Sequence, residues 1–232
     1  MHQFSNHAKS NEWQKHVTTD LPSVPINGTL VTHFISMFIG LTGNMGCGKS
    51  TAAHFFEEFG FSRIDSDALV RERILTAPEV EAEAVRRFGP SVLDPAGRID
   101  RPAIARTIFS NDAKRLAWED FILPRVYALW RELREAAPVG TRWIVEAPIL
   151  HEKELEKEFD FIVCVASSTA HQYARLRGRG FSQALAGQRI SKQFPLAKKI
   201  ELADFVLSND GDTDFLRDQI RHLAGLLQNR AL

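Results

Sequence analysis

Residues 43–50 carry the clearest chemistry in the sequence, because they read Gly-Asn-Met-Gly-Cys-Gly-Lys-Ser. This run fits G-x-x-x-x-G-K-[ST] at every fixed position, the pattern of a phosphate-binding loop. Glycines let backbone N–H groups curl around phosphate oxygens, and the loop opens onto a helix N-terminus that attracts anions. We expect Lys49 to reach the terminal phosphates and Ser50 to ligate Mg²⁺. The residues predicted to hold ATP and Mg²⁺ are Asn44, Gly46, Cys47, Gly48, Lys49, Ser50 and Thr51.

The flanking residues predict the strand and helix that such a loop requires. Residues 38–42 form an apolar run typical of a strand. After the loop, apolar side chains recur on one helical face, and Gly60 stands where a helix would stop. The residues of that face are Ala52, Phe55, Phe56 and Phe59. Because strand, loop and helix agree, a chance glycine-rich turn is a poor account of the motif.

Cys47 occupies a variable position of the loop and allows two interpretations. In the first, which is favoured, it is a small residue that fits the available space. In the second, the helix N-terminus and Lys49 lower the pKa of its thiol and make it reactive. The other cysteine, Cys164, falls in a predicted buried strand, where a thiol reacts slowly.

Two carboxylates, Asp65 and Asp67, follow the second predicted strand. Ligands of an open parallel sheet lie beyond the carboxyl ends of its strands, so both side chains are expected beside the phosphate loop. A carboxylate there can accept the proton of an attacking hydroxyl and help to hold hydrated Mg²⁺. The structural alternative makes Asp65 the N-cap of the next helix. The phosphate loop favours the functional interpretation.

Arg175 and Arg179 are four residues apart, so a helix would place them on one face. Arginines on a mobile segment can close over phosphates and stabilise their charge. The alternatives are a solvated helix end or a nucleic-acid patch, and the lack of interleaved aromatic residues disfavours the patch. The sequence has no N-K-x-D motif for reading guanine, which argues against a Ras-type GTPase. These features together indicate a small-molecule kinase.

Five short apolar runs, separated by helical patterns, are the predicted strands. They are residues 38–41, 61–64, 143–145, 161–165 and 205–207. We expect an α/β P-loop kinase fold with a doubly wound, five-stranded parallel sheet. Residues of about 75–140 lack a strand signal and predict a helical substrate-binding insertion, with breaks at Pro78, Pro90, residues 95–97 and Pro124. A lid is expected over about residues 170–195.

Composition narrows the class of protein further. Lys and Arg total 29 and Asp and Glu total 29, so no net charge draws the chain to nucleic acid or to a membrane. Two cysteines without metal spacing, and no apolar run that could span a bilayer, favour a cytoplasmic protein. Residues 1–36 read as a disordered extension whose histidines have no metal spacing, and Met37 is a plausible natural start. Residues 228–232 are a short tail.

Residues 37–227 resemble the dephospho-CoA kinase family in several blocks that occur in the family's order. The blocks are residues 39–43, 65–71, 88–89, 97–101, 146–152, 172–179, 189–193, 203–204 and 209–211. The resemblance implies ATP-dependent phosphorylation of the ribose 3′-hydroxyl of dephospho-CoA, which gives coenzyme A. The alternative is another nucleoside or nucleotide kinase of the same fold.

The resemblance also implies roles for individual residues. Asp67 would be the general base, with Asp65 assisting, and Lys49 and the lid residue Arg179 would complete the catalytic set. The residues that would contact the acceptor are Asp67, Arg71, Arg101 and Pro148. Two further residues would contact ATP, namely the lid residue Arg175 and Asn209, which would lie near the adenine.

Overall fold

The computed structural model describes residues 36–230, and side chains as far as residue 228. The predicted extension, except for Ser36, and the end of the predicted tail lie outside these residues. The described chain divides into two compact units. The smaller unit is Ile64–Ala137, and the larger unit combines the residues before Ile64 with those from Pro138 onward. No helix within the described residues is long and apolar enough to cross a bilayer.

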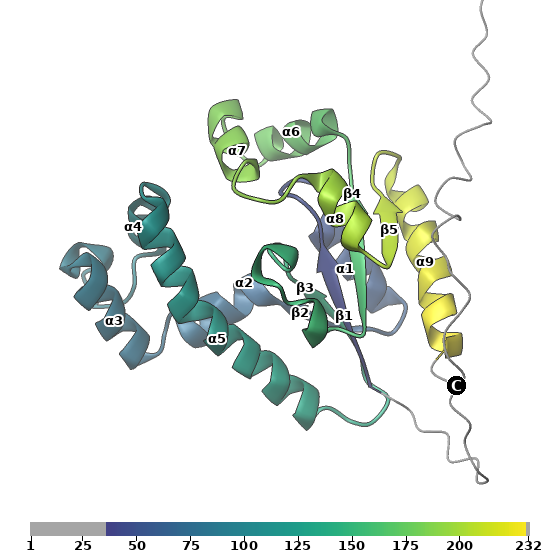
Figure 1. The fold of residues 1–232 in the computed structure, drawn as a ribbon, viewed down its shortest axis with the longest axis horizontal. Helices are drawn as coiled ribbons and strands as arrows, with labels where there is room; N and C mark the ends of the chain where they lie inside the picture. Colours follow the sequence, from purple (N-terminus) through teal and green to yellow (C-terminus); the bar gives the residue numbers. More distant parts are fainter. Residues whose placement is uncertain (1–35, 231–232) are drawn as a thin grey trace, which may run out of the picture. The chain divides into compact units, whose positions relative to one another are not determined.

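The larger unit is built on a five-stranded sheet with the order β2-β3-β1-β4-β5 (Figure 1). The strands are β1 (Met37–Thr42), β2 (Ser62–Asp65), β3 (Arg142–Glu146), β4 (Phe161–Ala166) and β5 (Phe205–Ser208). The pairs β1–β3, β1–β4 and β4–β5 are parallel. Parallel neighbours that are not consecutive in sequence need crossover connections. The doubly wound fold and all five predicted strands are therefore confirmed, with only small shifts of their ends.

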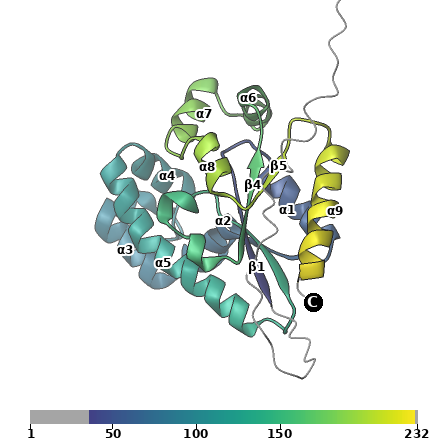
Figure 2. The same ribbon diagram turned by 45° about the vertical axis from the view of Figure 1, so that its right-hand side comes forward.

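Helices cover both faces of this sheet. Helices α1 (Lys49–Glu58) and α9 (Thr213–Arg230) lie side by side on one face, and α8 (Leu196–Leu202) lies on the other (Figures 1 and 2). Because strand side chains alternate between faces, Ile39 and Leu41 of β1 point into the core beneath α1 and α9. Phe55 and Phe56 of α1 fill the same core, as the predicted apolar face requires.

Two aspartates set the register of the central strands. Asp160 precedes β4 and accepts the N–H of Phe38 at 2.7 Å. Asp204 precedes β5 and accepts the N–H of Ile162 at 2.7 Å. The backbone N–H of each aspartate also donates to the strand that its carboxylate contacts. A slip by one residue would separate these pairs and move every side chain to the wrong face.

Helix α1 ends where the sequence predicted, at Gly60. This residue has φ of 83°, which a glycine adopts without a steric penalty. The N–H groups of Gly60 and Phe61 donate to the carbonyls of Glu57 and Phe56, which closes the helix as a Schellman motif. The chain then turns directly into β2.

Between β4 and α8 lie α6 (Thr169–Gly178) and α7 (Gln183–Ile190), over the residues predicted to form the lid. Ser168 and Ser182 start these helices, and their hydroxyls accept N–H groups of the first turns. Two short 3₁₀ turns, η4 (His151–Lys153) and η5 (Glu156–Glu158), connect β3 to β4.

The smaller unit is helical, as the sequence predicted. Its elements are α2 (Ser66–Leu69), the π-helix η2 (Val70–Ile74), α3 (Pro78–Phe88), the 3₁₀ turn η3 (Pro90–Val92), α4 (Arg101–Phe109) and α5 (Asp112–Ala136). Side chains from α3, α4 and α5 form its core, including Val80, Ile104, Trp118 and Trp130. The β-structure described within this unit, apart from the end of β2, is a bridge between Leu93 and Ile99.

The predicted helix break at Pro124 is wrong, because α5 continues through this residue. Proline removes a backbone hydrogen bond from a helix interior and costs about 3 kcal/mol. Four buried side chains spaced four residues apart lie on both sides of it, namely Trp118, Ile122, Val126 and Trp130. Burial of each contributes roughly 1.5–3 kcal/mol, so packing outweighs the local preference of proline.

Candidate active site

The phosphate loop connects β1 to α1, and its backbone has the shape of an anion site. Gly46 and Gly48 have φ of 84° and 96°, a region that other residues rarely adopt. Helix α1 begins without a side-chain cap and without an acidic residue in its first turn. Helices α2, α4, α5, α6 and α7 begin with a side chain that accepts an N–H group, whereas α3 and α8, like α1, do not. With no side-chain cap and no carboxylate in its first turn, the N-terminus of α1 is suited to bind an anion.

Lys49 lies at the mouth of this loop. Its ammonium group donates to the carbonyl oxygens of Gly43 and Asn44 at 3.0 and 3.2 Å. The Asn44 carbonyl also accepts the N–H of Cys47 at 3.1 Å, which closes a tight turn. A positive charge is thus held against the loop, where it can follow negative charge onto a phosphoryl group.

Ser50 belongs to a network that joins the loop to the far end of β3. Its hydroxyl donates to Oε2 of Glu146 at 2.9 Å. Oε1 of the same carboxylate accepts two hydrogen bonds from the Arg63 guanidinium, at 2.8 and 2.6 Å. The Glu146 side chain is 9% exposed, so Arg63 compensates a nearly buried charge. Glu146 directly follows the predicted strand 143–145, but no local pattern in the sequence indicated Arg63 as its partner.

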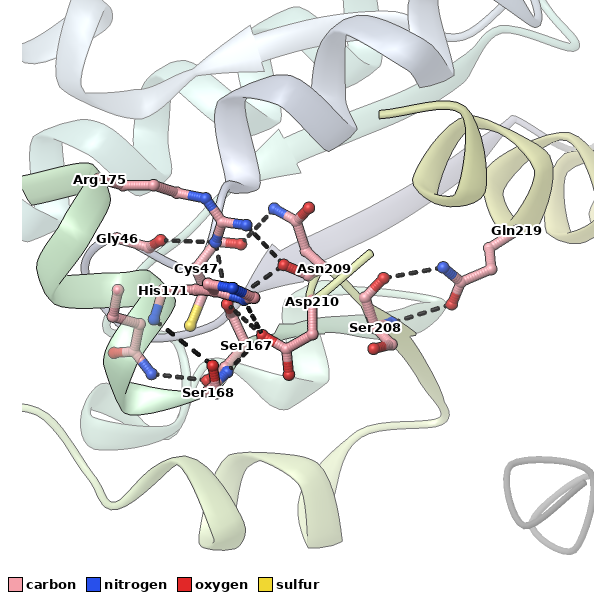
Figure 3. Close-up of polar contacts among 11 residues, drawn as sticks. Gly46, Cys47, Ser167, Ser168, His171, Arg175, Ser208, Asn209, Asp210 and Gln219 are labelled. Carbon is pink, nitrogen blue, oxygen red and sulfur yellow. Dashed lines mark hydrogen bonds and ion pairs between the residues drawn. The ribbon is translucent and has the colours of Figure 1, made fainter. Parts of the chain in front are cut away.

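A second network lies behind the loop and includes Arg175 of α6 and Asn209, which follows β5 (Figure 3). The Arg175 guanidinium donates to the carbonyl of Gly46 at 3.2 Å and to that of Asn209 at 2.6 Å. The Asn209 side-chain amide donates to the carbonyl of Cys47 at 2.8 Å. These two predicted ATP-binding residues therefore contact the loop backbone.

Asp210 anchors this second network. Its Oδ1 accepts the Ser167 hydroxyl, the Ser168 N–H and Nδ1 of His171, at 2.9, 2.7 and 2.8 Å. Burial raises the pKa of Asp210, but these hydrogen bonds outweigh it and lower the pKa to about 2. Asp210 is thus ionised across the working pH range and fixes the start of α6 to the end of β5.

The predicted lid also contacts the loop. The Gln193 side chain, in the turn between α7 and α8, accepts the N–H of Met45 at 2.8 Å. Arg179 caps the C-terminal end of α6 and is exposed, so its side chain faces solvent instead of the loop. The structure therefore brings Arg175 to the loop while leaving Arg179 outside it.

Pro148, predicted on the substrate side, belongs to a buried charge cluster. Its carbonyl accepts the Lys199 ammonium at 2.5 Å, and the same ammonium lies 2.8 Å from Oε1 of Glu152. The Lys199 side chain has no exposed surface, and that of Glu152 is 12% exposed. Oε1 of Glu152 also accepts the N–H of Phe194 at 2.8 Å. The cluster ties the segment after β3 to α8.

The remaining predicted residues lie in the smaller unit. Asp65 is the N-cap of α2 and accepts the N–H of Ala68 at 2.9 Å, so its structural interpretation is confirmed. Asp67 is exposed in the first turn of α2. Arg71 lies in the π-helix, a rare element that is frequent at functional sites. Arg101 is the exposed first residue of α4.

Comparison with known proteins decides the family. A profile of the dephospho-CoA kinase family matches residues 37–214. A dephospho-CoA kinase from Aquifex aeolicus is 33% identical over 183 residues, which cover 79% of this chain and 93% of the relative. A dephospho-CoA kinase from Gloeobacter violaceus is 37% identical over 183 residues, which cover 78% of this chain and 88% of the relative. The chain belongs to the dephospho-CoA kinase family. It is accordingly a phosphotransferase, as the resemblance implied.

Solved structures agree with this family in fold. A crystal structure of a Thermus thermophilus protein superposes with a TM-score of 0.72 at 30% identity, and covers 83% of this chain and 98% of that one. A dephospho-CoA kinase from Campylobacter jejuni gives a TM-score of 0.63 at 20% identity, with 84% and 98% covered. The fold of this chain thus extends over nearly the whole of both solved structures.

One interpretation of this kinase's loop is corrected by the structure. Burial raises the pKa of the Cys47 thiol, and the nearby Lys49 and backbone N–H groups do not reverse this. The reactive-thiolate interpretation of Cys47 is therefore wrong, because desolvation of the charged form outweighs the attraction of the loop. Cys47 is fully buried and fills space in the core beneath α1.

Proposed function

We propose that this kinase transfers the terminal phosphoryl group of ATP to the ribose 3′-hydroxyl of dephospho-CoA, giving coenzyme A and ADP in the cytoplasm. The observation that carries the proposal is the uncapped start of α1, preceded by an intact phosphate loop. Family membership supports the acceptor, because curated relatives over most of the chain are dephospho-CoA kinases.

ATP binding is assigned to the larger unit. The N–H groups at the start of α1 would receive the phosphate oxygens, and Lys49 would leave its loop carbonyls to contact the transferred group. The loop residues proposed to line this site are Asn44, Gly46, Cys47, Gly48, Lys49, Ser50 and Thr51. Arg179, exposed at the end of α6, is free to close over the phosphates as a lid residue.

Ser50 and Glu146 offer the oxygen atoms that Mg²⁺ prefers. No cluster of three or more His, Cys, Asp or Glu side chains that could hold a metal occurs among the described residues. Mg²⁺ is usually bound through one or two protein oxygens together with substrate phosphates, and Ser50 and Glu146 offer such oxygens. When bound, the ion would neutralise charge that develops on the phosphates.

Residues of the smaller unit are assigned to the acceptor. Asp67 is exposed and would take the proton of the 3′-hydroxyl as its oxygen forms a bond to the γ-phosphorus. The bond from that phosphorus to the β–γ bridging oxygen breaks, and the electron pair leaves with ADP. Asp65 would hold the start of α2 in place through its cap. Arg71 and Arg101 are also proposed to bind the acceptor, as is Pro148, which belongs to the larger unit.

A coupled assay of ADP release tests the proposal. With ATP and Mg²⁺, we expect rapid ADP release in the presence of dephospho-CoA, and background release with AMP, CMP or shikimate. Phosphorus NMR of the product should show a new monoester on the ribose 3′-oxygen. A rate with AMP or CMP equal to that with dephospho-CoA would replace this function with that of a general nucleotide kinase.

A further inference from the structure

Two carbonyls of the phosphate loop are bound by side chains from distant segments. Arg175 donates to the carbonyl of Gly46 at 3.2 Å, and Asn209 donates to that of Cys47 at 2.8 Å. In a planar trans peptide the C=O and the following N–H point in opposite directions. Holding the Cys47 carbonyl from behind therefore turns the N–H of Gly48 toward the phosphate side.

Further contacts fix the Arg175 side chain and the backbone of Asn209 in place (Figure 3). Arg175 also donates to the Ser167 hydroxyl at 2.9 Å and to the Asn209 carbonyl at 2.6 Å. Asn209 is 8% exposed, and its N–H continues the sheet by donating to Ala166 at 2.8 Å. Immediately before it, Gln219 of α9 binds both backbone groups of Ser208, at 2.9 and 2.8 Å.

The loop glycines permit this close approach. A Cβ built on Gly48 would collide with the side-chain nitrogen of Asn209, and one built on Gly46 would lie 2.8 Å from the carbonyl oxygen of Gln172. At these positions, glycine therefore allows the loop to pack against α6 and the end of β5, in addition to approaching phosphate. The loop and the residues behind it form one packed unit.

We propose that Arg175 and Asn209 are positioning residues that set the affinity of the phosphate loop for triphosphate. Asn209 orients the N–H of Gly48, and Arg175 holds the preceding turn, in which the Cys47 N–H donates to the Asn44 carbonyl. They act from behind the loop and do not contact the adenine or the transferred phosphoryl group. This departs from the adenine-contact and lid roles that the family resemblance implies. This proposal rests on the proposed function in one respect, because it requires that the loop binds a triphosphate.

Equilibrium binding separates these roles. The variant Asn209→Leu keeps the side-chain size and the backbone carbonyl but removes the amide donor. We expect it to weaken the binding of Mg²⁺-ATP and of inorganic tripolyphosphate by the same factor, about tenfold, measured by calorimetry. The affinity for adenosine and the ratio of ATP to GTP affinity should stay within twofold of wild type.

Arg175→Lys provides the second variant, because lysine keeps the charge but cannot reach several acceptors in a fixed fork. We expect a similar loss of tripolyphosphate affinity. In Arg175→Ala, added guanidinium ion should restore much of the lost affinity. The matched control is Arg177→Ala on the same helix, where the side chain is exposed, and its tripolyphosphate affinity should match wild type.

The outcomes distinguish the hypotheses. Unchanged tripolyphosphate binding in Asn209→Leu, together with weakened ATP binding, would overturn the proposal in favour of an adenine contact. Wild-type affinity in Arg175→Lys would overturn it in favour of a simple charge effect. A wild-type protein that binds neither ATP nor tripolyphosphate would instead contradict the proposed function. Thermal unfolding of each variant shows whether it folds. If one variant does not fold, Arg175→Lys and the guanidinium rescue of Arg175→Ala still test the proposal.

Discussion

Lys199 is a fully buried residue of α8, so replacing it tests how this part of the enzyme is held together. Its ammonium is 2.8 Å from Oε1 of Glu152. At an effective dielectric constant of about 20, that separation corresponds to roughly 6 kcal/mol of Coulomb attraction. Much of this attraction offsets the cost of removing the two charges from water. In Lys199→Met the same Glu152 carboxylate would keep little solvent and would lose the cation that lies 2.8 Å away. We therefore expect a loss of about 3–5 kcal/mol in the free energy of unfolding.

Urea unfolding of the ligand-free protein measures this loss directly. In a separate thermal unfolding experiment, we expect the melting temperature of Lys199→Met to fall by about 6–20 °C for a protein of this size. The double variant Lys199→Met/Glu152→Gln should recover at least half of the loss, because glutamine is neutral and can still accept the N–H of Phe194. The control is Lys198→Met, an exposed neighbour on the same helix whose ammonium lies 3.9 Å from the Phe194 ring centre. Lys198→Met should lose no more than about 1 kcal/mol in the free energy of unfolding.

Two results would refute this reasoning. A loss below about 1 kcal/mol in Lys199→Met would mean that water reaches the site and screens the pair. A double variant as unstable as the single one would show that the stability comes from lysine packing and from its bond to the Pro148 carbonyl, and not from the charge pair.

Further predictions concern catalysis, thiol chemistry and acid stability. Lys49→Ala should abolish most turnover and leave the melting temperature within a few degrees of wild type. A rate within a few-fold of wild type would remove the loop from the mechanism. Asp67→Asn should lower kcat by about 10²–10⁴-fold with ATP affinity unchanged, whereas a larger effect of Asp65→Asn would reassign the base. Because burial raises its thiol pKa, Cys47 should react with iodoacetamide at neutral pH only on unfolding, and ATP-protected labelling of the native enzyme would contradict this. The depressed pKa of Asp210 contributes stability above about pH 4, and this stability is lost as the pH falls toward 2. Asp210→Asn should therefore destabilise the enzyme more at pH 7 than at pH 3. Equal effects at the two pH values would count against the hydrogen-bond origin of the pKa shift.

The strands were predictable because their signal is local. Each predicted run lies within an observed strand, as in the fully buried β1, or overlaps most of one, as in β2. A parallel sheet covered on both faces requires continuous apolar runs, so composition over a few residues is enough to find them. The phosphate loop was equally local, because its glycines and its lysine all lie within residues 43–50.

The prediction at Pro124 failed because tertiary packing opposes the local rule. The propensity of proline is a property of one residue, whereas the buried stripe of α5 gains its energy from the helices it packs against. Lys199 was missed for a related reason. A lysine on a short helix is nearly always exposed, and nothing near it in sequence indicates that Glu152 would compensate its charge.

The sequence by itself determined the fold class, the position of the phosphate loop and the family, because each depends on short patterns in their order. The tertiary structure alone decided how the loop is held. Gly46 and Cys47 meet Arg175 and Asn209 only because α6 and β5 return to the loop from more than a hundred residues away. Such contacts depend on the three-dimensional path of the chain, and no spacing within one segment encodes them. The same holds for the buried thiol of Cys47, whose pKa depends on how completely the folded core excludes water.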